Sequence, residues 1–190
     1  MKHLAIIMDG NRRWASNNAL ASTFGHNKGA ETLSVIAREV GNLQIPFLSV
    51  FAFSAENWGR SQTEVSALIN LMRIYLIKEL ETLGSENIRL CIIGDTSPFP
   101  EDLRVIFHDA SQKTKKNTGL TLTIAVNYGG MQDIVATAAK FNPDSQTSSL
   151  EQQIIEFKSQ MMTGILPPVD MLVRTGREKR LSNFMLWDCA

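Results

Sequence analysis

Short apolar runs alternate with longer segments of helical periodicity along almost the whole chain. The apolar runs predict strands at 3–8, 47–53, 88–93, 120–126 and 169–173. The remaining periodic segments predict helices at 28–43, 62–83, 100–116, 131–141 and 149–162. Strands that alternate with helices are typical of a parallel sheet covered on both faces. The sequence therefore predicts an α/β fold, with a mostly parallel central sheet flanked by helices.

The length of the chain bounds its domain organisation. Its 190 residues fit one domain, 1–190, and the best candidate for a linker, NPDSQTSS at 142–149, is too short to divide it. The segment LSNFMLWDCA at 181–190 predicts a helical stretch that stops without a cap or a polar tail. We therefore expect the C-terminus to be truncated within a structural element.

The charge balance argues against several classes of partner. Lys plus Arg and Asp plus Glu number 19 each, so no net charge favours nucleic acid or an anionic membrane. No apolar run approaches the ~18 residues of a membrane-spanning helix. Cys91 and Cys189 lie far apart, without the spacing of a zinc site. We expect a cytoplasmic protein with no nucleic-acid partner and no transmembrane segment.

A polar cluster follows each predicted strand. In chain order these clusters are Asp9, SAENW (54–58), GDTS (94–97), NYGG (127–130) and RTGREKR (174–180). The carboxyl ends of parallel strands share one edge of a sheet, and ligands bind in the crevice outside it. A single polar loop after a strand is ordinary, but five such loops in succession favour a ligand site at this edge.

The segment MDGNRR at 8–13 places one acid immediately before two arginines. This arrangement could be an ordinary surface ion pair. Alternatively, a helix N-terminus with Arg12 and Arg13 can hold a diphosphate, and Asp9 can bind its Mg²⁺. A second basic cluster contains Arg174, Arg177, Lys179 and Arg180. Two anion sites on one edge suggest two phosphorylated substrates.

The helix predicted at 62–83 is apolar on more than one face. Its main stripe comprises Val65, Leu68, Ile69, Met72, Tyr75, Leu76, Leu80 and Leu83, and Leu71, Ile74 and Ile77 widen it. A helix buried against the sheet is the favoured interpretation. The alternative is that the extra apolar surface lines a channel for a hydrocarbon chain.

Taken together, these motifs resemble the cis-prenyltransferases, the undecaprenyl diphosphate synthase-like isoprenyl transferases. The resemblance rests on HLAIIMDGNRRWA, FGHNKGAE, FAFSAENWGR, IIGDTS, NTGLTLTIAVNYGG and PVDMLVRTGREKRLSNFMLW, in family order. It implies a magnesium-dependent enzyme that condenses isopentenyl diphosphate onto an allylic diphosphate with cis double-bond formation. It also implies an apolar substrate tunnel in the α/β fold and a homodimer.

The resemblance assigns roles to individual residues. Asp9 corresponds to the catalytic, magnesium-binding aspartate, and Asn57 to the group that accepts or orients the departing proton. Residues expected to bind the allylic diphosphate are Gly10, Asn11, Arg12, Arg13, Trp14 and His26. The loop that follows the second strand contributes Ser54, Ala55, Glu56, Trp58 and Arg60. The isopentenyl diphosphate site corresponds to Arg174, Arg180, Leu181 and Ser182.

Several positions depart from the family pattern. Ser22 stands where an arginine is common, and Arg177 and Lys179 replace a glycine and a histidine. A further magnesium-binding glutamate is expected beyond Ala190.

We expect an undecaprenyl diphosphate synthase that uses farnesyl diphosphate and contacts the membrane peripherally for product release. A short-chain or branching cis-prenyltransferase is the alternative. A non-catalytic subunit of a heteromeric prenyltransferase is a third reading, although such subunits typically lose the motifs around Asp9 and Asn57. A haloacid-dehalogenase-type phosphatase would need a second aspartate where Asn11 stands.

Overall fold

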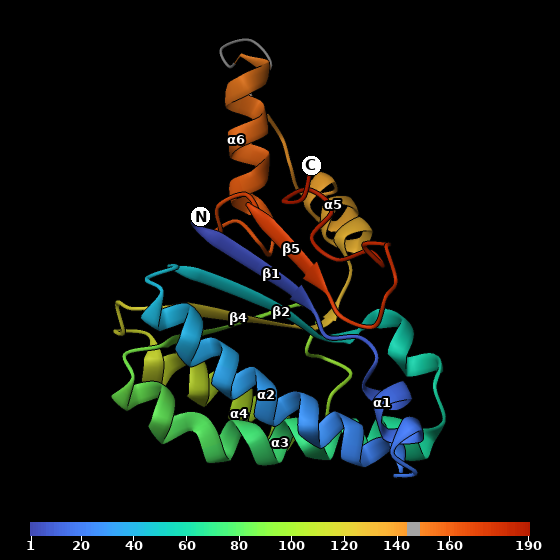
Figure 1. Ribbon diagram of the computed structural model, residues 1–190. Helices are drawn as coiled ribbons and strands as arrows, with labels where there is room; N and C mark the ends of the chain where they lie inside the picture. The colour runs from blue at the N-terminus through green and yellow to red at the C-terminus, as the bar shows by residue number, and fades with distance from the viewer. Residues whose placement is uncertain (144–148) are drawn as a thin grey trace.

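A parallel five-stranded sheet forms the centre of the computed structural model, which describes residues 1–143 and 149–190 (Figure 1). Its strands are β1 (His3–Ile7), β2 (Phe47–Ser54), β3 (Arg89–Ile93), β4 (Thr121–Tyr128) and β5 (Met171–Arg174). They are ordered β3-β4-β2-β1-β5, and every pair of neighbours is parallel. The predicted α/β fold and its strands are confirmed, with ends displaced by one or two residues.

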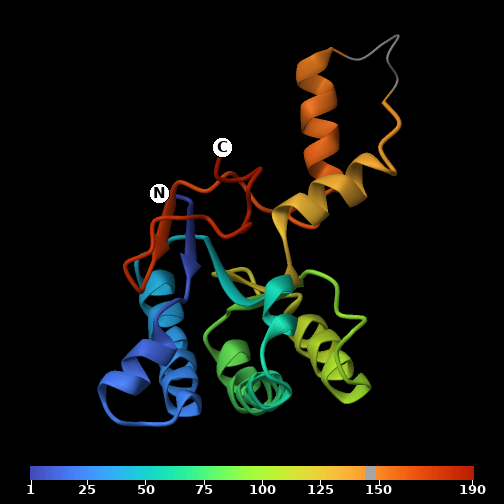
Figure 2. The ribbon, with the colours of Figure 1, turned by 90° about the vertical axis from the view of Figure 1, so that its right-hand side faces the viewer.

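Helices cover the two faces of this sheet unequally. The helices are α1 (Asn11–Asn17), α2 (Ser22–Asn42), α3 (Gln62–Ser85), α4 (Glu101–Thr114), α5 (Gly130–Ala138) and α6 (Leu150–Gln160). Figure 2 shows α2, α3 and α4 below the sheet, whereas α5, α6 and the C-terminal segment lie on the opposite side. No helix within residues 1–143 and 149–190 is long and apolar enough to cross a membrane.

Two apolar cores lie on the two sides of the sheet. Alternation along β2 supplies both, since Val50 belongs to the core beneath the sheet and Phe51 to the other. The larger core packs α2, α3 and α4 against the strands. In the smaller core, the rings of Phe51 and Phe184 stack with centroids 4.6 Å apart. The C-terminal segment is therefore anchored to the sheet by apolar packing.

Two predictions differ most from the structure. Helix α2 begins at Ser22 rather than at 28, because Gly25 allows it to pack directly on α1. Residues 181–190 form turns instead of a helix, and Ser182, Asn183 and Met185 have positive φ angles of 49°, 63° and 44°. Burial of Phe184 and Met185 determines this path. Most of the predicted linker, 144–148, lies outside the described residues.

His3 is fully buried and links β1 to its surroundings. Its Nε2 lies 2.8 Å from Ser49 Oγ, and its Nδ1 lies 2.8 Å from the carbonyl oxygen of Pro167. Burial, the largest influence, lowers the pKa of the imidazole below its ordinary 6.5. His3 is therefore neutral at neutral pH and connects β2 to the segment that leads into β5.

The neutral His3 makes stability depend on pH. Its contribution is fully present above the unfolded pKa of 6.5 and is lost as pH falls, because the unfolded chain takes up the proton first. One such group changes the free energy of unfolding by at most about 1.4 kcal/mol per pH unit. We expect His3→Gln to flatten the decline in the free energy of unfolding below pH 6.5. Denaturant unfolding at several pH values measures this. An unchanged slope would contradict this assignment.

Candidate functional site

The order of the strands brings three of the polar clusters together. Strands β2, β1 and β5 are consecutive neighbours, so Asp9, the loop 54–60 and the loop 174–182 follow adjacent carboxyl ends. In Figure 1 the arrowheads of β1, β2 and β5 point toward the same side of the molecule. The clusters after β3 and β4 lie farther along the same edge. There, Asn127 Nδ2 donates to the carbonyl oxygen of Asp95 over 2.9 Å.

Asp9 lies at the centre of this edge and binds Arg174. The guanidinium donates from Nη2 and Nε to Asp9 Oδ2 over 2.7 and 3.1 Å, and the Gly10 N–H donates to Asp9 Oδ1 over 2.7 Å. Partial burial alone would raise the pKa of Asp9. The hydrogen bonds from Arg174 and Gly10, with the charges of Arg174 and Arg180, outweigh burial and lower that pKa below 3.8. Asp9 is therefore a carboxylate at neutral pH.

Thr175 fixes the backbone on which Asp9 stands. Its hydroxyl accepts from the Asp9 N–H over 2.8 Å and donates to the Asp9 carbonyl oxygen over 2.5 Å. Gly10 and Gly176 have φ angles of 92° and 84°, and a β-carbon on Gly10 would lie 3.0 Å from Gly176 Cα. This close approach joins the two basic segments that the sequence places more than 160 residues apart.

Arg13 adds a second link between these segments, because its Nη1 donates to the carbonyl oxygen of Gly176 over 2.7 Å. Arg174 Nη1 also donates to the Arg180 carbonyl oxygen over 2.5 Å and to Ser182 Oγ over 2.7 Å. Arg174 therefore contacts both Asp9, which follows β1, and the loop 174–182, which follows β5. Arg180 itself is mostly exposed and pairs with Glu178.

Glu64 gathers three basic side chains beside the loop that follows β2. Its carboxylate lies 2.7 Å from Arg60, 3.7 Å from Arg12 and 3.8 Å from His26. Burial, followed by the charge of Arg60, lowers the pKa of His26 below 6.5, so this ring is neutral at neutral pH. Glu64 also lies in the first turn of α3, where its N–H donates to Ser61 Oγ over 3.3 Å.

The loop after β2 forms a 3₁₀ helix, Ala55–Gly59. Asn57 Oδ1 accepts from the Ser54 N–H over 3.1 Å, which holds the amide at the entrance of the cavity described below. Trp58 instead donates from Nε1 to Asn127 Oδ1 over 3.0 Å and packs against Phe53 and Phe99. The loop therefore combines a residue that faces the cavity with one that anchors the loop to the core.

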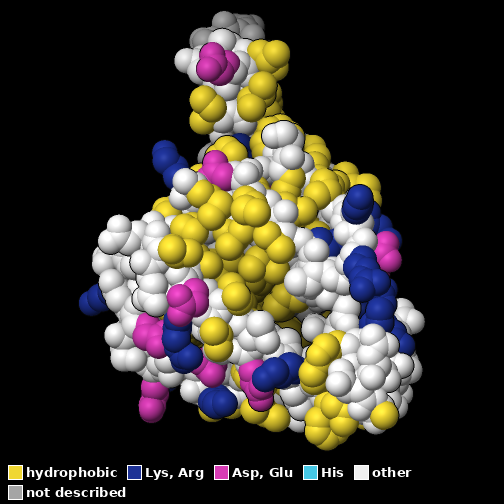
Figure 3. Space-filling model, viewed as in Figure 1, with side chains coloured by type: hydrophobic (Ala, Val, Ile, Leu, Met, Phe, Trp, Pro, Cys, Tyr) yellow, Lys and Arg dark blue, Asp and Glu magenta, His cyan; other side chains and the backbone are white. Residues whose placement is uncertain are grey.

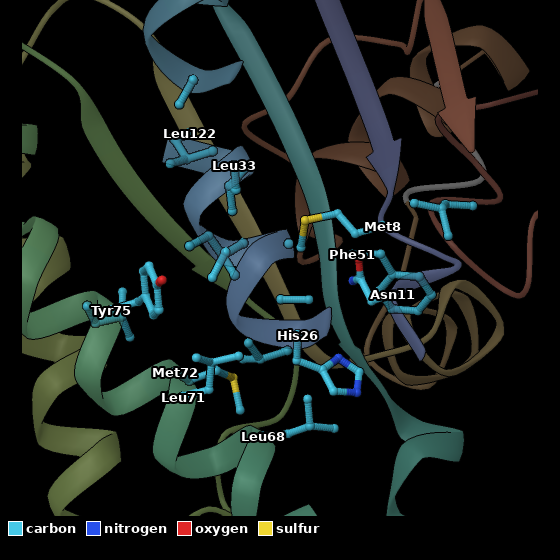
Figure 4. Close-up of a pocket in the computed structure, with 18 of the residues that line it drawn as sticks. Met8, Asn11, His26, Leu33, Phe51, Leu68, Leu71, Met72, Tyr75 and Leu122 are labelled. Atoms are coloured by element: carbon cyan, nitrogen blue, oxygen red, sulfur yellow. The ribbon is translucent and has the colours of Figure 1, made fainter. Parts of the chain in front are cut away.

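Two glycines in α2 bring α1 against it. A β-carbon on Gly25 would lie 2.0 Å from the Asn11 carbonyl oxygen, and one on Gly29 would lie 2.8 Å from Asn11 Nδ2. Any larger side chain would force the two helices apart. This crossing places Asn11 and His26 in the lining of the same cavity (Figure 4).

We expect Gly25→Ala to lower the free energy of unfolding by about 1–3 kcal/mol, because the added methyl group meets backbone atoms that cannot move independently. Gly84→Ala is the matched control, since a β-carbon there meets nothing within 4 Å. That change should leave stability unchanged or raise it by up to about 1 kcal/mol. Denaturant unfolding of both variants measures the contrast, and equal effects would contradict the proposed helix crossing.

A cavity of about 680 Å³ opens at this edge and extends between the sheet and helices α2 and α3. Asp9, Asn11, His26 and Arg174 line its charged end. Beyond them its walls are mainly apolar and include Leu33, Ala37, Leu68, Leu71, Met72, Leu76, Leu122 and Val126. Figure 4 shows Met8, Asn11 and His26 toward one end, and Leu33 and Leu122 toward the other.

The surface of the molecule shows the same separation of charged and apolar side chains as the cavity does. Figure 3 shows apolar side chains gathered over the strands, a hollow below them, and Lys and Arg side chains along the side toward which the strands point. Helix α3, which covers the helix predicted at 62–83, packs against the sheet as expected. Its Leu68, Leu71 and Met72 also line the cavity, whereas Ile74 and Ile77 are exposed.

Not every predicted site residue lines the cavity. Those that do are Asp9, Asn11, His26, Ser54, Glu56, Asn57, Arg60, Arg174, Arg180 and Ser182. The remaining predicted residues, Gly10, Arg12, Arg13, Trp14, Ala55, Trp58 and Leu181, lie outside its lining. Neither Thr175 nor Glu64 was predicted from the sequence as a site residue. Thr175 could have been found in the RTG motif at 174–176, whereas an acid near the start of a helix, such as Glu64, is too common a pattern to indicate a site.

Comparison with known proteins identifies the family. The model of the undecaprenyl diphosphate synthase family matches residues 7–190. The isoprenyl transferase of Treponema denticola is 40% identical over 190 residues, covering 100% of this chain and 82% of that protein. The ditrans,polycis-undecaprenyl-diphosphate synthase ((2E,6E)-farnesyl-diphosphate specific) of Buchnera aphidicola is 44% identical over 193 residues, covering 100% and 78%.

A solved structure extends this agreement to three dimensions. The crystal structure of lavandulyl diphosphate synthase from Lavandula x intermedia, in complex with dimethylallyl diphosphate, superposes with a TM-score of 0.89. The two sequences are 33% identical, and the match covers 98% of this chain and 82% of that one. The resemblance drawn from the motifs is confirmed. This chain belongs to the undecaprenyl diphosphate synthase family of isoprenyl transferases.

Proposed function

We propose that this protein is a magnesium-dependent cis-prenyltransferase that extends farnesyl diphosphate with isopentenyl diphosphate. One observation supports this most strongly: the ionised pair of Asp9 and Arg174 stands at the mouth of a long apolar cavity. A charged mouth suits diphosphate, and apolar walls suit a growing hydrocarbon chain. The allylic substrate would therefore have its diphosphate at the edge of the sheet and its hydrocarbon chain in the cavity beneath the sheet.

The two halves of the edge suit two diphosphates. On the side of α1, Asn11, Arg12, Arg13 and His26 would bind the allylic diphosphate, together with backbone N–H groups from Asn11 onward. On the side of β5, Arg174, Arg180 and Ser182 would bind isopentenyl diphosphate. The contact between Arg174 and Asp9 supports two sites that adjoin each other. Holding both substrates in register removes an entropic barrier of about 7–11 kcal/mol.

The residues present fit a magnesium ion that is shared with substrate. Within the described ranges, no group of three or more His, Cys, Asp or Glu side chains could hold a metal alone. Mg²⁺ is commonly held by one or two carboxylates plus substrate phosphates, and Asp9 supplies one ionised, partly exposed carboxylate. When bound, the ion would stabilise the negative charge that develops on the leaving diphosphate.

The reaction requires one bond to break, one to form and one proton to leave. The allylic carbon–oxygen bond breaks and its electron pair departs with pyrophosphate. The double bond of isopentenyl diphosphate then attacks the allylic cation, and a proton is lost from the adjacent carbon. Asn57 would orient this proton loss, because the Ser54 N–H holds its Oδ1 in place. As a neutral amide, Asn57 is a weak base, so released pyrophosphate is the alternative acceptor.

The chain also has to protect the cation from water. Leu68 and Leu122 belong to the apolar wall of the cavity, and their hydrocarbon side chains make no hydrogen bond to water. Exclusion of water from such a site also strengthens the electrostatic contacts at its mouth.

A short or branched product is the second candidate, because a solved neighbour is a lavandulyl diphosphate synthase. Incubation with radiolabelled isopentenyl diphosphate and either farnesyl or dimethylallyl diphosphate distinguishes the two. Long products from farnesyl diphosphate support the main proposal. A product that stops after two or three additions supports the alternative, and no incorporation from either substrate contradicts both.

We further propose that the enzyme acts in the cytoplasm as a homodimer and contacts the membrane peripherally to release product. Helix α6 stands away from the sheet in Figure 1, and its Leu150, Ile154 and Ile155 are 73%, 47% and 64% exposed. Such an apolar surface supports association with another surface.

A further inference from the structure

Three charged side chains lie where the apolar cavity ends. Arg38, Glu79 and Glu86 line it together with Leu83, Ile88 and Leu90. Arg38 lies near the end of α2, about 18 Å along that helix from His26 at ~1.5 Å per residue. Glu79 lies about 22 Å along α3 from Glu64, by the same measure. These charges are therefore at the end of the cavity opposite the proposed diphosphate sites.

The three side chains form a bridge between the two helices that wall the cavity. Arg38 Nε donates to Glu86 Oε1 over 2.6 Å, and Arg38 Nη2 lies 3.6 Å from Glu79 Oε2. The side chains of Glu79, Glu86 and Arg38 are 19%, 33% and 41% exposed. They are therefore half-buried, with one side toward the cavity and the other toward solvent. We call Arg38, Glu79 and Glu86 the ion-pair bridge.

A smaller cavity of about 300 Å³ lies against the outer side of the bridge. It shares Ser34, Arg38, Tyr75, Glu79 and Thr82 with the main cavity, and adds the charged Glu31 and Lys78. The ion-pair bridge thus stands at the boundary between an apolar space and a polar space that leads to the surface between α2 and α3.

We propose that the ion-pair bridge closes the far end of the cavity and sets the length at which the product stops growing. This inference rests on the proposed function. A growing chain that reaches the bridge would have to separate Arg38 from two carboxylates and place its apolar end between them. Separating the pairs would leave uncompensated charges beside hydrocarbon, which costs more than leaving the charges paired. Elongation past the bridge is therefore disfavoured relative to release.

The test compares product lengths among matched variants of the full chain. Arg38→Glu places three acids at the boundary and should open it by repulsion, and Arg38→Ala should open it by truncation. The double variant Arg38→Glu/Glu86→Arg restores an opposite pair. Arg73→Ala is the control, because it removes an ion pair that Arg73 on α3 makes with Asp102 on α4, and Arg73 does not line the cavity. Each enzyme receives the same diphosphates, and the products are separated by chain length.

We expect both single Arg38 variants to shift the dominant product by one or more additional isoprene units. The double variant should return toward the wild-type length, and Arg73→Ala should match wild type. Thermal unfolding of each variant identifies loss of fold, and the two different Arg38 substitutions keep the test decisive if one is unstable. A folded Arg38 variant with wild-type product length, whatever its rate, overturns the inference. No condensation by the wild-type enzyme overturns the proposed function and the inference together.

Discussion

Asp9→Ala is expected to reduce the condensation rate by about three orders of magnitude while the protein stays folded. The variant removes a carboxylate at the mouth of the cavity. This carboxylate accepts hydrogen bonds from Arg174, in one proposed site, and from the N–H of Gly10, at the start of the other. Electrostatic stabilisation of a leaving group by a metal is worth several kcal/mol, and each ~1.4 kcal/mol is tenfold in rate. Release of pyrophosphate at saturating substrate measures the effect.

Asp102→Ala is the matched control for Asp9→Ala. It also removes an acid paired with an arginine, but that pair lies on the outside of α3 and α4. Circular dichroism and thermal unfolding should show both variants folded. A rate in Asp9→Ala within tenfold of wild type would contradict the assignment of Asp9 as the metal-binding residue.

Arg180→Ala is expected to raise the KM for isopentenyl diphosphate by about 10- to 100-fold. A charge-assisted hydrogen bond contributes about 1.5–3 kcal/mol, and the Arg180 side chain lines the mouth beside Arg174. The KM for the allylic substrate should change much less, because its proposed contacts lie on α1 and α2. Initial rates with each substrate varied in turn separate the two constants.

Lys179→Ala tests whether the effect of Arg180→Ala is one of position or of charge alone. Lys179 carries the same charge one position earlier but does not line the cavity. We expect it to leave both KM values close to wild type. Equal increases in the two KM values for Arg180→Ala, or equal effects of the two variants, would contradict the division of the edge into two sites.

Local patterns predicted the strands and the sheet edge because both depend on short-range periodicity. The alternation along β2 determines which face Val50 and Phe51 occupy, and the polar residue after each strand marks the edge. The start of α2 could not be predicted in this way. Gly25 disfavours a helix locally, and only its contact with Asn11 makes a glycine suitable there.

The contacts within the site depend on long-range packing and were less accessible. The pairing of Asp9 with Arg174 follows from the adjacency of β1 and β5, which periodicity does not encode. The C-terminal segment was misassigned because its apolar residues resemble a buried helix, whereas Phe184 and Met185 are buried through turns. Trp58 belongs to a motif expected to bind substrate, but its ring is held by Asn127 and the core.

The most direct test is a crystal structure with Mg²⁺, isopentenyl diphosphate and a thiodiphosphate analogue of farnesyl diphosphate. We expect one diphosphate at the start of α1 with the metal on Asp9, and the other against Arg174, Arg180 and Ser182. The farnesyl chain should lie along Leu68 and Met72, inside the cavity. Diphosphates bound away from the carboxyl edge of the sheet, or a hydrocarbon chain outside the cavity, would contradict the account.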